Sequence, residues 1–114
     1  MTRPEDRVSI DAHDFCRRCN LDVELAGQVD RFRNALSCTS FLERDQIYPE
    51  DEAAAFGIIY SDDLAMFLFA EGLLTNERFH YDFPMEEASS VGDIIRLTLK
   101  LNDQAEQAVH GNTH

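Results

Sequence analysis

The chain has few of the features that mark several common classes of protein. It contains no tryptophan, only three prolines and five glycines among 114 residues, and no apolar run near the roughly 20 residues that span a bilayer. Its N-terminus lacks the charged and then apolar layout of a secretory signal. Its three cysteines, an odd number, argue against a disulfide framework. We therefore expect a cytoplasmic protein with free thiols.

Basic residues are also scarce. Ten Lys and Arg stand against 22 Asp and Glu, which gives a net charge of −12. Such a charge repels nucleic acids and anionic membranes, so we expect neither as a partner, and it favours basic protein surfaces instead. Hydrophobic residues nevertheless make up 44% of the chain and include eight Phe, which predicts one globular domain.

Helical periodicity dominates the first third of the sequence. Asp11 is placed to cap a short helix over residues 12–19, and Asn20 and Asp22 then interrupt it. A longer amphipathic helix follows, because apolar residues recur at spacings of three and four, while the charged residues from Glu24 to Arg33 lie mostly off this stripe. The stripe consists of Leu21, Leu25, Val29, Phe32 and Leu36.

The next twenty residues lack sustained periodicity and predict a long ordered loop. Loops of this length inside a small domain are uncommon and tend to be functional. We expect its apolar residues to anchor it in the core, namely Phe41, Leu42, Ile47, Phe56 and Ile58, with one helical turn over Ala53 to Ala55. Ser61 then stands before the apolar run Leu64–Ala70, which predicts a second main helix that continues through Leu73 and Leu74.

The last main helix is predicted to begin at Ser89 or Ser90. Val91, Ile94, Ile95, Thr98 and Leu99 follow this cap at helical spacing. The predicted fold class is all-α: a small bundle of three main helices plus short turns, with the long ordered loop between the first two. We predict an N-terminal extension (residues 1–20), a helical domain (21–102) and a flexible C-terminal tail (103–114).

The order of these segments resembles the acyl carrier protein family. The stretch Ser89-Ser90-Val91-Gly92-Asp93 resembles the TVGD-like start of that family's last helix. Phe56-Gly57 resembles the Leu-Gly step that precedes its modified serine, and residues 47–51 resemble part of its loop. The resemblance covers about Leu21 to Leu101 and implies an acyl-carrier-like bundle.

Ser61 is the residue to which the resemblance assigns chemistry. In the family, a DSL serine at the start of the second helix carries 4′-phosphopantetheine, which a Mg²⁺-dependent transferase adds from coenzyme A. Here the sequence reads Tyr60-Ser61-Asp62-Asp63-Leu64, without the family's preceding aspartate and following leucine. Two versions therefore stay open: a carrier modified on Ser61, and an unmodified version of the fold used for protein contacts. An ordinary N-cap is the structural alternative for Ser61.

Four acidic residues on or near the second main helix form the predicted partner-binding set. Carboxylates at such positions steer encounter with Lys and Arg on acyl-processing or transferase enzymes. The residues are Asp62, Asp63, Glu71 and Glu77. The sequence predicts no catalytic residue in the chain itself, and so no enzyme.

Two other classes of protein remain alternatives. One is a small acidic adaptor or inhibitor that binds a basic partner surface. The other is a metal-binding domain built on Cys16 and Cys19, whose spacing suits zinc, with His13 and Cys38 as further ligands. Because only one Cys-x-x-Cys pair is present, we interpret these cysteines as structural and predict no metal.

Overall fold

The computed structural model describes residues 7–111 except 59, 80, 81, 85 and 87. This part of the chain contains the α-helices α1 (Ala12–Arg18), α2 (Ala26–Ser37), α3 (Ser61–Ala70) and α4 (Val91–Gly111). Short 3-10 turns lie between them: η2 (Val23–Leu25), η3 (Arg44–Gln46), η4 (Ala53–Phe56) and η5 (Glu77–Phe79). The all-α prediction is confirmed, because the described residues form no strand and only one isolated bridge, between Glu52 and Ser90.

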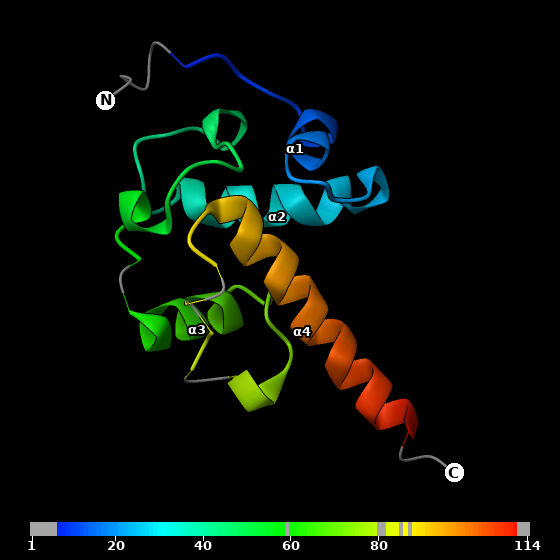
Figure 1. Ribbon diagram of the computed structural model, residues 1–114. Coiled ribbons are helices and arrows are strands. Elements are labelled where there is room, and N and C mark those ends of the chain that lie inside the picture. Colours follow the sequence, from blue (N-terminus) through cyan, green and yellow to red (C-terminus); the bar gives the residue numbers. More distant parts are fainter. Residues whose placement is uncertain (1–6, 59, 80–81, 85, 87, 112–114) are drawn as a thin grey trace.

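The helices surround one core. Figure 1 shows α1 and η3 on one side of α2 and α3 on the other, with α4 crossing α2 and then projecting away from the body. Fully buried side chains from all parts of the chain meet in this core, including Phe15, Val29, Ile47, Leu64 and Ile95. None of the helices in the described ranges combines the length and the apolar character that crossing a membrane requires.

Helix α1 forms as its cap predicted. The Asp11 side chain accepts a hydrogen bond from the amide of Asp14 at 2.8 Å, and Phe15 and Cys16 are buried. Asn20, with a φ of 60°, then turns the chain. The residues predicted as an N-terminal extension therefore share the core with the rest of the protein.

Helix α2 differs from its prediction in two ways. It is shorter, because Asp22 caps the separate turn η2 before α2 begins at Ala26. It also buries Arg33 completely, although we placed this residue off the apolar stripe. Its guanidinium pairs with Asp30 at 2.8 Å and donates to the carbonyl of Ile10 at 3.0 Å, which satisfies the buried charge.

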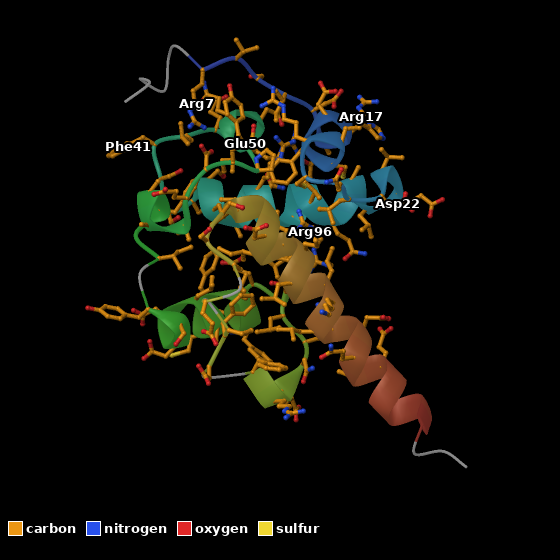
Figure 2. The ribbon with its side chains drawn as sticks, in the orientation of Figure 1. Arg7, Arg17, Asp22, Phe41, Glu50 and Arg96 are labelled. Carbon is orange, nitrogen blue, oxygen red and sulfur yellow. The ribbon has the colours of Figure 1, made fainter. Side chains whose placement is uncertain are left out.

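The described residues between α2 and α3 are ordered as predicted, with one exception among the anchors. Ile47 and Phe56 are buried, and Leu42 and Ile58 are partly buried. Phe41 is 97% exposed, so its predicted role as an anchor is wrong. Figure 2 shows its side chain pointing away from the body of the molecule. The adjacent Leu42 packs against the core instead.

Helix α3 ends earlier than predicted. Its last residue is Ala70, and Gly72 adopts a positive φ of 71°, which stops the helix. Leu73 and Leu74 are therefore not helical, yet both are buried. The apolar pattern correctly indicated burial but overestimated the length of the helix.

Helix α4 begins where predicted and is held there by the long loop. Ser90 Oγ accepts a hydrogen bond from the amide of Asp93 at 3.2 Å, as an N-cap does. The amides of Val91 and Gly92 donate to the carbonyls of Asp51 and Pro49, at 2.8 and 2.9 Å. At its other end the helix continues to Gly111, so regular structure extends past the predicted domain end at residue 102.

A long-range hydrogen bond joins α4 to the end of α1. Arg96 Nη2 donates to the carbonyl of Cys19 at 2.6 Å, and the two residues are 77 positions apart. Cys19 is the C-cap of α1, so this bond satisfies one of the carbonyls that a helix end leaves without an internal partner.

Candidate functional site

Ser61 is the first residue of α3 and does not cap it. Tyr60 occupies the N-cap position, and no side chain makes a capping hydrogen bond there. Ser61 is partly exposed, and no described residue pairs with its hydroxyl. The N-cap interpretation of Ser61 is therefore wrong, and its hydroxyl makes no hydrogen bond to a described residue that would stabilise the helix start.

The acidic residues fall into two groups at opposite ends of α3. Asp62 and Asp63 are exposed in the first turn, where carboxylates interact favourably with the helix dipole, and Asp62 Oδ1 accepts from the amide of Asp63 at 2.9 Å. Glu71 is the exposed C-cap of α3, and Glu77 is exposed in η5. Only Asp62 and Asp63 lie beside Ser61.

Two exposed side chains with large apolar parts flank these carboxylates. Tyr60 is 65% exposed and Met66 is 52% exposed. Met66 lies four residues after Asp62 and three after Asp63, so all three share one side of the helix. We call Tyr60, Ser61, Asp62, Asp63 and Met66 the α3 surface. It combines an available hydroxyl, two negative charges and apolar contact area.

An apolar hollow lies behind this surface, between α2, η4, α3 and α4. Its free volume of about 10 Å³ has room for one water-sized sphere, and every residue that lines it is apolar. The lining consists of Phe32, Leu36, Ala53, Ile58, Leu64, Phe67, Leu68, Val91, Ile94 and Ile95. Leu64 lies one helical turn after Ser61, so the hollow and the hydroxyl are neighbours along α3.

The four residues considered as metal ligands, Cys16, Cys19, His13 and Cys38, do not come together in the structure. Cys16 and Cys19 are buried, whereas His13 and Cys38 are exposed. Among the described residues, no group of three or more His, Cys, Asp or Glu is placed to hold a metal ion. Cys19 Sγ donates to the carbonyl of Phe15 at 3.3 Å. Burial raises the pKa of both the Cys16 and the Cys19 thiols, which keeps them protonated and unreactive.

The sequence did not reveal a polar cluster that joins the N-terminal segment to the long loop. Arg7 makes two hydrogen bonds to the Asp51 carboxylate, at 2.6 and 2.8 Å, and a third to the carbonyl of Gln46 at 2.6 Å. Its guanidinium lies 4.4 Å from the centre of the Tyr48 ring. The hydrogen bond to Asp51 raises the pKa of Arg7 above its usual value.

Arg33 had a sequence signal that could have identified it, but Arg7 had none. Arg33 lies four residues after Val29 and three before Leu36, so it belongs to the buried stripe by spacing alone. The partner of Arg7 is 44 positions away, and no local pattern connects the two residues.

Comparisons of the chain with protein-family models, with curated proteins and with solved structures find no match. The function is therefore inferred from the fold and from the geometry of the α3 surface. They define a small, acidic, mostly helical protein with a serine at the start of a helix that makes no capping hydrogen bond.

Proposed function

We propose that the protein is an acyl-carrier-like protein that carries 4′-phosphopantetheine on Ser61. One observation supports this most directly: Ser61 is partly exposed at the first position of α3, and its side chain does not cap the helix. A serine required only for capping would occupy the position that Tyr60 holds. A transferase can reach a hydroxyl in this position without unfolding the helix.

The surroundings of Ser61 suit such a carrier. The prosthetic group would supply a thiol on a long arm, and the chemistry on its cargo would belong to other enzymes. The apolar hollow behind α3 offers the kind of lining that an acyl chain prefers over water. On this proposal the protein itself is not an enzyme, and its bundle has the acyl-carrier-like arrangement that the sequence order resembles.

The proposed partners are enzymes with basic docking surfaces. Asp62 and Asp63 stand beside the attachment point, and the chain as a whole carries a charge of −12. Both features attract Lys and Arg on a partner and accelerate encounter at low ionic strength. Glu71 caps the far end of α3 and Glu77 lies beyond it in η5, so both would act through the long-range electrostatic field more than through contacts at the serine.

Intact mass spectrometry tests the attachment. The protein is incubated with coenzyme A, Mg²⁺ and a transferase of broad specificity, and we expect the mass to rise by one phosphopantetheine group. Ser61→Ala should abolish the gain, whereas Ser89→Ala, which removes another exposed serine, should leave it intact. An unchanged mass of the wild-type protein would rule out modification by this class of enzyme.

The α3 surface also supports a second function, that of an unmodified interaction protein. Tyr60 and Met66 expose apolar area beside two carboxylates, a combination that fits a basic partner with an apolar pocket. The mass experiment separates the two functions, because this version requires no modification. Binding that weakens strongly with salt would support it.

A further inference from the structure

The apolar hollow is closed by the same residues that tie the long loop to α4. Ala53 and Val91 both line the hollow. The amide of Ala53 donates to the carbonyl of Ser89 at 3.0 Å, and the amide of Val91 donates to the carbonyl of Asp51 at 2.8 Å. These two bonds flank the bridge between Glu52 and Ser90. We call residues 51–53 and 89–91 the bridge region.

The hollow cannot accept an acyl chain in its present size. A free volume of about 10 Å³ holds a single water-sized sphere, so its walls must separate before any chain can enter. The bridge region is a suitable place for this separation. It is held by a few hydrogen bonds, whereas the walls from α2 and α3 belong to regular helices.

A segment near the N-terminus holds the loop half of the bridge region. Residues 7–10, here called the strap, lie across the loop that precedes Asp51. The Arg7 guanidinium donates a hydrogen bond to each oxygen of the Asp51 carboxylate. The amide of Ile10 donates to the carbonyl of Asp45 at 2.8 Å. Figure 2 shows Arg7 pointing from the strap toward the loop that carries Glu50.

Asp51 connects the strap to α4 through two different groups. Its carboxylate accepts from Arg7 and also from the amide of Tyr48, at 2.8 Å, while its carbonyl accepts from Val91. If Arg7 leaves, the carboxylate keeps only its local partner. The strap then no longer holds Asp51 in place, so the bond between its carbonyl and the amide of Val91 in α4 weakens.

The two ends of the strap are held very differently. At Ile10 the side chain is buried and the carbonyl accepts from the buried Arg33 at 3.0 Å. At the Arg7 end the contacts are polar and can be replaced by water. The Arg7–Asp51 pair is part-buried, with side chains 17% and 11% exposed, and the Tyr48 hydroxyl donates to the carbonyl of Val8, whose side chain is exposed. The Arg7 end can therefore detach while the Ile10 end stays in place.

We propose that the strap is a latch on the apolar hollow. Detachment of Arg7 from Asp51 loosens the bridge region and opens the hollow to an apolar chain, and reattachment closes it. That the chain is an acyl group rests on the proposed carrier function. The latch itself concerns only the strap, the loop and α4.

Hydrogen exchange followed by NMR tests the latch on the full-length protein. Arg7→Gln removes the ion pair, and we expect exchange at the amides of Ala53, Val91 and Gly92 to accelerate by about tenfold or more through local opening. The matched control is Arg17→Gln, because Arg17 forms an exposed ion pair with Asp14 within α1, where Figure 2 labels it. This control should leave all three rates unchanged.

An uncharged apolar fluorophore, N-phenyl-1-naphthylamine, provides the second readout. It should bind more tightly to the Arg7→Gln variant than to the wild-type protein or to Arg17→Gln. Asp51→Asn, which removes the ion pair from the other side, should reproduce both the exchange and the binding results.

Two outcomes would overturn the latch. One is unchanged exchange at the three amides in the Arg7→Gln variant. The other is faster exchange there together with an equal acceleration at the amide of Phe32 in α2, which would mean that Arg7 stabilises the whole fold. Neither readout involves Ser61, so an unmodified Ser61 with a working latch would overturn the carrier function alone.

Discussion

Gly92 and Pro49 lie so close together that any side chain at position 92 would crowd the proline. A Cβ atom on Gly92 would stand 3.0 Å from the Cβ of Pro49 and 3.0 Å from the Cβ of Cys19. Both neighbours are fixed, one in the loop and one at the end of α1. Gly92 thereby allows the start of α4 to approach both segments, and its amide donates to the Pro49 carbonyl.

We predict that Gly92→Ala destabilises the protein although alanine is the better helix former. Overpacking against the two neighbours costs about 1–3 kcal/mol, which exceeds the gain of about 1 kcal/mol in helix propensity. Gly27→Ala in α2 is the control, because nothing lies within 4 Å of the Cβ it would introduce. Urea denaturation should show a loss for the first variant and no loss for the second. Equal stabilities of the two variants would contradict the close approach.

The buried Arg33 gives a second prediction. Arg33→Ala leaves the carbonyl of Ile10 and the carboxylate of Asp30 without their buried partner, and we expect a loss of about 3 kcal/mol in the free energy of unfolding. Arg31→Ala, on the same helix but exposed, should cost less than about 0.5 kcal/mol. Chemical denaturation measures both. A small loss in the Arg33 variant would show that water replaces its hydrogen bonds.

Two serines at helix starts should differ in how much their replacement costs. Ser90→Ala removes the acceptor for the amide of Asp93 and should cost about 1 kcal/mol. Ser61→Ala removes no capping bond, and we expect a change within about 0.5 kcal/mol. Thermal and urea unfolding of the two variants provide the test. A loss in the Ser61 variant as large as that of Ser90 would restore a capping role for Ser61.

The buried cysteines predict a loss of stability at alkaline pH. Burial raises the pKa of Cys16 and of Cys19 in the folded state, so the folded protein holds these protons more tightly than the unfolded chain does. Their contribution is fully present below the unfolded thiol pKa of about 8.5 and is lost as the pH rises through the folded values.

Urea midpoints measured from neutral to alkaline pH should therefore fall. In a variant that carries both Cys16→Ala and Cys19→Ala, the midpoints should fall less steeply, because the two buried thiols no longer contribute to the pH dependence. An identical slope in the two proteins would show that the thiols do not contribute.

Features that depend on neighbouring residues were predictable from the sequence. The caps Asp11 and Ser90 act within three residues of their own positions, and the structure confirms both. The burial of Val29 and Phe32 follows from helical spacing in the same way. Ser61 is the exception, because a helix start places several residues within one turn and the sequence does not fix which of them becomes the cap.

Features that depend on distant partners were not predictable. The ion pair of Arg7 with Asp51 spans 44 positions, and an arginine near a chain end carries no sign of such a partner. The exposure of Phe41 has a similar origin. Phe41 and Leu42 are adjacent on a bend, so only one of them can turn toward the core, and hydrophobicity alone does not decide which.

The bond between Arg96 and the Cys19 carbonyl has a consequence for biosynthesis. A chain grows from its N-terminus, so α1 leaves the ribosome long before Arg96 has been added. During that interval the end of α1 lacks its long-range donor, and the carbonyls of Pro49 and Asp51 lack theirs. The nascent chain therefore cannot settle into its final arrangement until the start of α4 has been translated.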